Sequence, residues 1–291
     1  MSLLDIHKGW TASGVAAART VHRLYDSPVI FEDDAAIHLL SSAERYLCQS
    51  KFIYKLILER SITEFRPFIF HSFSCQRYAE EQLPRAIGQH KKQYVILGAG
   101  FDSFALRRQD LKSTLRIFEV DHPQSQEFKR KRIAKSPYSA PENLEFVPVD
   151  FELETVLDGL KRSRFDFSQP AFCSWMGTVM YLTEDAVLAT LEAMASLKPG
   201  SELIFNYASP HDSLSDADRE MVKDLETTLR RGSAPINTTF VPAAIAKTVS
   251  ELGFDIRAHL SSKDLDERYL AGWEGLQTIP FGHLLHLQVS G

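Results

Sequence analysis

Residues 94–103, with the sequence Tyr-Val-Ile-Leu-Gly-Ala-Gly-Phe-Asp-Ser, carry the clearest chemical pattern in this chain. A short, largely apolar run leads into Gly98-x-Gly100, and a helix-compatible stretch follows. That order is typical of the strand, turn and helix of a nucleotide-type cofactor site. Glycine suits the turn because a Cβ would block the bend of the backbone and the close approach of a ligand. The pattern therefore predicts cofactor binding at these two glycines. The alternative is a plain glycine turn in an ordinary α/β fold.

The third glycine of the dinucleotide fingerprint is missing, because Ser103 occupies its place. A site that binds no pyrophosphate can do without that glycine. The pattern therefore favours S-adenosylmethionine, which carries adenosine but no phosphate, over a nicotinamide dinucleotide.

Two carboxylates follow at the spacing expected for contacts with the ribose hydroxyls of adenosine. Glu119 and Asp121 lie about twenty residues past the glycines, where a strand is predicted to end. We expect Asp121 to bind the ribose, because Glu119 lies earlier on the same face and is more readily covered. Asp150 ends the next predicted strand and is expected to bind the adenine amino group, with Phe151 against the ring. The alternative for Asp150 is a helix N-cap.

These residues need a scaffold, and strand-like and helix-like segments alternate from residue 94 onward. Strands are predicted over residues 94–97, 115–120, 144–149, 171–175, 202–207, 254–260 and 283–289. Helices are predicted over residues 125–135, 151–160 and 184–197. This alternation predicts an α/β fold with a mainly parallel, doubly wound sheet.

The first 90 residues show helical periodicity and no clear strand, which predicts an N-terminal helical cap over residues 1–90 and a core over 91–291. Helices are predicted over 14–24, 35–58 and 66–83, the last one closing at Pro84. The polar segment 210–242 is interpreted as a lid over the substrate. An inert surface excursion is the alternative.

Composition narrows the class of protein. The 291 residues are 44% hydrophobic and 24% charged, as expected for a soluble globular protein, and the net charge of -5 argues against nucleic-acid binding. No apolar run approaches the length of a membrane span, so no membrane partner is expected. Three widely spaced cysteines indicate neither a disulfide framework nor a zinc site. These features favour a cytoplasmic location, and they do not determine the oligomeric state.

Five ordered segments, at residues 77–80, 94–107, 118–123, 147–151 and 177–183, resemble the leucine carboxyl methyltransferase family of class I S-adenosylmethionine-dependent methyltransferases. The chain is most similar to a bacterial branch that includes polyketide O-methyltransferases. The resemblance implies a Rossmann-like methyltransferase sheet, mostly parallel with an antiparallel last strand, and an N-terminal helical cap. The two strand-like segments that close the chain suit that expectation.

The resemblance also implies roles for particular residues. Arg77 would pair with the carboxylate of the cofactor's methionine part, and Arg19 would be a second basic contact. Gly98 and Gly100 would let the backbone pass beneath the cofactor. Asp121 would bind the ribose, and Asp150 and Phe151 would bind the adenine.

Two positions depart from the family pattern. Met176 stands before Gly177 where much of the family has a glutamate that contacts the cofactor, and Cys75 stands where relatives often carry a second arginine. Both changes are expected to weaken cofactor binding or to shift its contacts.

Methyl transfer needs few catalytic side chains near the acceptor, because the main requirements are alignment of the acceptor with the methyl group and exclusion of water. A carboxylate acceptor needs no general base, whereas a hydroxyl does. Tyr181, Tyr207 and His211 are the substrate-side candidates, with His283 as a further candidate base. His283 and His286 lie three residues apart on a predicted strand and point to opposite faces, so no metal site is expected.

The sequence thus predicts an S-adenosylmethionine-dependent O-methyltransferase acting on a carboxylate or hydroxyl of a small molecule, in secondary metabolism. The first alternative is a methyltransferase of protein C-terminal carboxyl groups. The second is a cofactor-binding protein of this fold without catalysis, and the third is a nicotinamide oxidoreductase.

Overall fold

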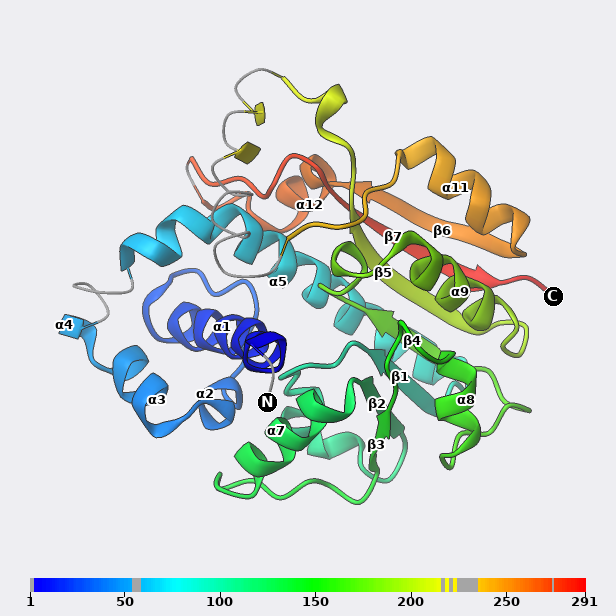
Figure 1. Ribbon diagram of the computed structural model, residues 1–291, viewed down its shortest axis with the longest axis horizontal. Coiled ribbons are helices and arrows are strands. Elements are labelled where there is room, and N and C mark those ends of the chain that lie inside the picture. The colour runs from blue at the N-terminus through cyan, green and yellow to red at the C-terminus, as the bar shows by residue number, and fades with distance from the viewer. Residues whose placement is uncertain (1–2, 54–58, 216–217, 220–221, 224–234, 274) are drawn as a thin grey trace.

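The computed structural model describes residues 3–53, 59–215, 218–219, 222–223, 235–273 and 275–291. Its centre is a seven-stranded sheet in the order β3-β2-β1-β4-β5-β7-β6 (Figure 1). The strands are β1 Gln93–Leu97, β2 Arg116–Asp121, β3 Leu144–Pro148, β4 Phe172–Trp175, β5 Glu202–Ala208, β6 Phe254–Ser261 and β7 Gly282–Val289. Only β7 runs antiparallel to its neighbours β5 and β6. The predicted strands and the antiparallel last strand are confirmed.

Helices cover both faces of the sheet (Figure 1). One face carries α1 Leu3–Tyr25, α5 Glu59–Gly88, α7 Pro123–Ile133 and α12 Ser262–Tyr269, and the other carries α8 Val156–Lys161, α9 Glu184–Ala195 and α11 Pro242–Glu251. The shorter helices are α2 Ala36–Leu39, α3 Ser42–Gln49, α4 Lys51–Ile53, α6 Phe104–Arg107, η2 Gln109–Leu111, η3 Val179–Tyr181 and η4 His211–Ser213. The sheet is therefore the middle layer of three.

Burial on both faces explains why β1 is apolar throughout. Val95 and Leu97 join the core beneath α8, α9 and α11. Tyr94 and Ile96 point the other way and join the core formed with α5 and α12. A parallel strand covered on both faces reads as a continuous apolar run rather than an alternating one.

The single helix predicted over 35–58 is wrong within the described residues, where α2, α3 and α4 replace it. Leu40 is extended, with ψ 154°, and Ser41 starts a new helix. The Ser41 hydroxyl accepts from the Glu44 amide, and the Glu44 carboxylate accepts from the Ser41 amide. This capping box stabilises a fresh N-terminus and ends the earlier turn. Residues 54–58 lie outside the described part of the chain.

The predicted end of the third helix at Pro84 is also wrong, since α5 continues to Gly88 with Pro67 and Pro84 inside it. An internal proline removes one helix hydrogen bond. Leu83 and Ala86 on either side of Pro84 are buried, at 1% and 0% exposure. Their packing against the sheet offsets the missing bond.

The helix predicted over 151–160 begins five residues late. Helix α8 starts at Val156, with Thr155 as its N-cap. Asp150 accepts a hydrogen bond from the Glu152 amide at 3.1 Å, so its carboxylate holds a turn that precedes the helix. The alternative role of Asp150 as a helix N-cap is therefore wrong.

The boundary between cap and core at residue 90 stays a prediction. Helix α5, which precedes that boundary, packs directly on β4 and β5.

The lid interpretation of 210–242 also stays a prediction, because residues 224–234 and several neighbours lie outside the described residues. No helix in the described ranges is long and apolar enough to cross a membrane.

Candidate functional site

The turn after β1 requires both of its glycines. Gly98 has φ 62° and Gly100 has φ 46°, in the left-handed region that residues with a Cβ rarely adopt. A Cβ on Gly98 would also collide with the side chain of Thr178, which lies after β4. Gly100 faces Ala12 of α1. The turn is thus enclosed between the loop after β4 and the first helix.

Asp121 ends β2 directly beside this turn. Its carboxylate accepts hydrogen bonds from the backbone amides of Gly100 and His122. Burial raises the pKa of Asp121, although these two amides and Lys129 favour the charged form. A half-buried acceptor at the strand's carboxyl end is placed where ligands bind in open α/β sheets.

Glu119, the other carboxylate considered for the ribose, is covered. Its Oε2 lies 2.5 Å from Lys129 Nζ of α7, and both side chains are at most 2% exposed. Burial raises the pKa of Glu119 to about 7, against the attraction of Lys129. The pair is closed off from ligand, which leaves Asp121 as the accessible acid at this strand end.

Asp150 and Phe151 lie after β3, and the Phe151 side chain reaches the end of β4. The Phe151 ring stacks on Trp175 with a centroid distance of 6.1 Å and an interplanar angle of 14°. Asp150 Oδ2 lies 3.4 Å from His122 Nε2. The structure thus brings Asp121, Asp150 and an aromatic pair to neighbouring strand ends, and their adenosine contacts stay predictions.

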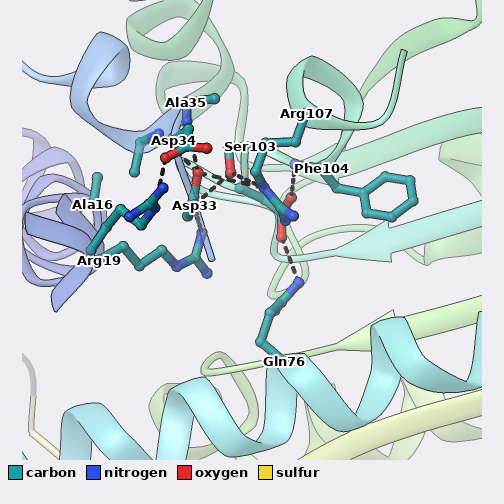
Figure 2. Close-up of polar contacts among 12 residues, drawn as sticks. Ala16, Arg19, Asp33, Asp34, Ala35, Gln76, Ser103, Phe104 and Arg107 are labelled. Atoms are coloured by element: carbon teal, nitrogen blue, oxygen red, sulfur yellow. Dashed lines mark hydrogen bonds and ion pairs between the residues drawn. The ribbon is translucent and has the colours of Figure 1, made fainter. Parts of the chain in front are cut away.

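Ser103, in the place of the missing third glycine, connects the turn to the cap. Its hydroxyl lies 2.6 Å from Asp33 Oδ2 and accepts from Arg107 Nε at 2.9 Å. Figure 2 shows Asp33 between Arg19 and the Ser103–Arg107 pair. Asp33 also accepts from the amides of Ala35 and Ala36. One buried carboxylate therefore holds α1, the start of α2 and the glycine turn together.

Helix α5 is fastened to the same turn by two further contacts. Gln76 donates to Asp102 Oδ2 at 3.0 Å, and Arg107 makes a bidentate ion pair with Glu80 at 3.1 and 2.6 Å. Sequence reasoning missed this network. The one local signal for it is Asp33, an N-cap type just before the helix-forming run at Ala35.

Arg77 and Arg19, the two arginines expected near the cofactor carboxylate, have different surroundings. Arg77 pairs with Glu81 at 2.8 Å, donates to the Ile30 carbonyl at 3.1 Å and stacks on the Tyr269 ring. Arg19 is 6% exposed and reaches Asp33 only at 3.5 Å. Its Nε has no hydrogen-bond partner among the described residues.

An apolar cluster lies at the carboxyl ends of β4 and β5, and we call it the acceptor-side cluster. Its buried members are Met180, Ala208, Val222, Ile279 and Phe281. Tyr181 packs against them half-buried, and burial raises its pKa. Asn237 lies near the end of the segment 210–242, and its side chain donates to the Tyr181 carbonyl at 2.9 Å.

The other substrate-side candidates differ in place: His211 contacts this cluster through Phe281, whereas Tyr207 belongs to the core beneath α8, α9 and α11. Tyr207 is 1% exposed, and its hydroxyl lies 2.7 Å from His259 Nε2. The ring of His283 stacks on Tyr207 at 5.2 Å, and His211 meets Phe281 at 5.0 Å. His286 lies on the other face of β7 and bonds Glu202 at 2.9 Å, so the predicted separation of the two strand histidines is confirmed.

His71 of α5 is a buried histidine that sequence reasoning missed. Its ring fills the space that a Cβ on Gly282 would occupy, and its Nε2 lies 3.5 Å from Cys75 Sγ. Burial lowers the pKa of His71 to about 3, and burial with His259 lowers that of His283 to about 4. Both rings are neutral near pH 7.

Replacing His71 with asparagine should make the fold less sensitive to acid. The unfolded chain takes up this proton near pH 6.5, whereas native His71 stays neutral to about pH 3. Stability is therefore lost as pH falls below 6.5, by about 1.4 kcal/mol per pH unit for one group. Between pH 7 and pH 5 this group accounts for about 2 kcal/mol, so urea denaturation at the two pH values should show the loss of stability reduced by that amount.

His90→Asn is the matched control, because His90 is exposed and has φ 65°, a conformation that asparagine tolerates. Equal slopes in both variants would rule out His71 as the source of the acid sensitivity.

A cavity of about 740 Å³ lies at the opposite edge of the sheet. It is lined by residues at the amino ends of β1, β2 and β3, among them Gln93, Arg116 and Asn143. Ligands of open α/β sheets bind at the carboxyl ends of strands. We therefore assign this cavity no part in the candidate site.

The chain has clear relatives. The family model for leucine carboxyl methyltransferases matches residues 12–195. The chain belongs to the leucine carboxyl methyltransferase family. Two bacterial relatives carry the name "Putative S-adenosyl-L-methionine-dependent methyltransferase". The Bacillus subtilis protein is 27% identical over 93% of this chain and 94% of its own length. The Rhodococcus jostii protein is 29% identical over 70% of this chain and 67% of its own length.

Solved structures give the same fold. A DUF574 family protein from Streptomyces avermitilis has a TM-score of 0.60 at 13% identity, over 94% of this chain and 97% of its own. A methyltransferase-like protein from Thermobifida fusca has a TM-score of 0.54 at 17% identity, over 92% and 100%. The mostly parallel sheet with an antiparallel β7 is therefore the Rossmann-like methyltransferase sheet.

This leucine carboxyl methyltransferase family member is an S-adenosylmethionine-dependent methyltransferase. The residues at the turn suit that cofactor. Arg19 Nε and Trp175 Nε1 are shielded from solvent and have no partner among the described residues. Such donors are costly unless a ligand accepts from them. Asp121 and the stacked Phe151 complete a set suited to a carboxylate and an adenosine.

Met176, in place of the family glutamate, is a packing residue. It lies half-buried against the core formed by Ile96, Ile204 and their neighbours. The adjacent Gly177 amide donates to Asn206 Oδ1 at 2.7 Å, and Gly177 has φ 66°. The loop after β4 is therefore held by Asn206, without a carboxylate at position 176.

Proposed function

We propose that this methyltransferase transfers the methyl group to an oxygen of a small molecule, a carboxylate or a hydroxyl, in secondary metabolism. The observation that carries the proposal is the acceptor-side cluster. Its buried members bear no ionisable group, and they lie at the strand ends where acceptors bind. Apolar side chains at this place suit an acceptor with an apolar body. A charged peptide would meet few partners there.

The protein's own residues have simple tasks in this reaction. S-adenosylmethionine supplies a methyl group that its sulfonium already activates. The enclosed glycine turn binds and orients the cofactor together with Asp121 and Arg19. Met180 and Phe281 exclude water from the acceptor side. For a hydroxyl acceptor, His211, His283 and Tyr207 remain the candidate bases. His211 and Tyr181 contact the acceptor-side cluster, while His283 stacks on Tyr207.

Arg19→Gln should weaken binding of S-adenosylmethionine by about 10-fold or more, the value of a charge-assisted hydrogen bond. We propose Arg19 as the main partner of the cofactor carboxylate, because Arg77 already bonds Glu81 and Ile30. Arg77→Gln should cost less than about 3-fold. Calorimetric titration of both variants measures the difference. The reverse order would return the role to Arg77.

An acceptor panel tests the proposed function. The purified protein is incubated with S-adenosylmethionine and small aromatic acids, phenols, enols, or a protein that ends in a leucine carboxyl group. Methylation of small molecules supports the proposal. Methylation of the protein terminus alone would favour the family's protein-modifying activity. Tight cofactor binding with no turnover on any acceptor would favour a non-catalytic role.

The cysteines agree with a cytoplasmic location, which we also propose. Cys48, Cys75 and Cys173 are all buried and unbridged. Burial raises the pKa of each thiol, to about 11 for Cys48, so none is poised as a reactive thiolate. Reduced, unpaired thiols are usual in the cytosol. Partners other than a small molecule are not expected.

A further inference from the structure

A small cavity of about 260 Å³ lies between α2, α3 and the end of α7, and its lining is strongly basic. Four of the seven lining residues are His38 of α2, Arg45 of α3, Arg132 of α7 and Lys135 just after α7. The other three are Leu40, Ser41 and Ser42, so no acidic residue lines it. Figure 1 shows α2 and α3 beside α7, and α2 contacts α7 directly.

The positive charges around this cavity are poorly neutralised. Arg45 Nε donates to the Ile37 carbonyl at 3.2 Å, and neither Arg45 nor Lys135 has a carboxylate within 4.0 Å in the described part of the chain. Glu44 reaches Arg132 at 3.6 Å. That carboxylate already accepts from the Ser41 amide and the Ser13 hydroxyl. Among the described residues, the Glu44 carboxylate therefore pairs with one of these three cations, Arg132, and leaves Arg45 and Lys135 without a carboxylate partner.

His38 adds a donor to this group. Its Nδ1 is shielded from solvent and bonds to no described residue. Burial and the positive charge of Arg45 both lower the pKa of His38, as expected where cations repel one another. Bringing like charges together is unfavourable unless an anion compensates them.

We propose that this pocket binds a phosphate group, either free phosphate or the phosphate of a larger molecule. Arginine and lysine are the usual phosphate partners, and Ser41 and Ser42 line the same space. The volume lies just below that of pockets for drug-sized ligands, as suits a small anion. None of the lining residues belongs to the glycine turn, so this site is separate from the cofactor site. Its occupant would join the cap to α7.

Titration of the full-length protein with sodium phosphate tests the proposal, with sodium chloride holding the ionic strength constant. We expect saturable calorimetric binding and a rise in melting temperature, because a ligand that binds only the native state stabilises it. Glycerol 2-phosphate forms the second arm. Binding of inorganic phosphate alone assigns the site to the free anion, and tighter binding of the ester assigns it to a phosphorylated molecule.

The double variant Arg45→Gln/Lys135→Gln should bind phosphate about 100-fold more weakly, about 10-fold for each cation. Lys131→Gln is the matched control, because Lys131 lies on α7 four residues before Lys135, is exposed and pairs with Glu127. If the double variant unfolds, Lys135→Gln alone replaces it. Equal binding in variant and control, or a response to phosphate no larger than to chloride, would overturn the proposal. Binding of S-adenosylmethionine should be unchanged in every variant, which keeps this test independent of the methyltransferase function.

Discussion

Replacing Lys129 with methionine should lower the free energy of unfolding by about 3–5 kcal/mol, the typical cost of removing one partner of a buried ion pair. Lys129 and Glu119 lie 2.5 Å apart with side chains 2% and 1% exposed. Without the ammonium group, which lowers the pKa of Glu119, the carboxyl group must either stay charged and buried or take up a proton, and both are unfavourable at pH 8. Urea denaturation at pH 8, above the pKa of about 7 of Glu119, is the measurement.

Lys131→Met is the control, since Lys131 and its partner Glu127 are about two-thirds exposed. An exposed pair of this kind contributes about 0–1 kcal/mol. The double variant Glu119→Gln/Lys129→Met should recover much of the lost free energy of unfolding, because it also removes the ionisable group of Glu119. A Lys129→Met protein as stable as Lys131→Met would mean that the pair is not buried as described.

Asp121→Ala should weaken binding of S-adenosylmethionine by about 1.5–3 kcal/mol, or about 10-fold to more than 100-fold. The carboxylate accepts from Gly100 and His122 and lies at the end of β2, so it shapes the turn at the strand end where we propose that the cofactor binds. Titration calorimetry measures the cofactor affinity, and a melting curve on the same sample shows whether the fold is retained.

Asp110→Ala provides the comparison for Asp121. Asp110 is exposed, pairs with Arg108 at 2.7 Å and follows the same glycine turn along the chain. Its replacement should leave cofactor affinity within about 2-fold, as expected for a surface pair. An Asp121→Ala protein that is folded and binds as well as wild type would remove Asp121 from the site.

Local patterns in the sequence were sufficient for the scaffold. Strands buried on both faces are uniform apolar runs, and the glycine spacing marks the turn that follows the first of them. The preference for Asp121 over Glu119 also followed from position along one strand. These features depend on residues close together in the chain, so periodicity and steric rules report them directly.

Helix boundaries required information from packing. Pro84 ordinarily ends a helix, yet α5 runs past it because Leu83 and Ala86 are buried against the sheet. Phe151 stacks on Trp175, and the chain forms a turn held by Asp150 before α8 begins. Tertiary contacts of this kind outweigh local propensity, which spans less than about 1 kcal/mol for most residues.

By itself the sequence determined the sheet, the glycine turn, the accessible acid beside it and the family. Only the tertiary structure decided which distant side chains meet. Asp33 bonds to Ser103, 70 residues further along the chain, and also pairs with Arg19. His38 and Lys135 are nearly a hundred residues apart and line one cavity. Such pairings depend on how helices dock rather than on local spacing, because hydrophobic burial brings the elements together and the polar groups then bond whatever lies within reach.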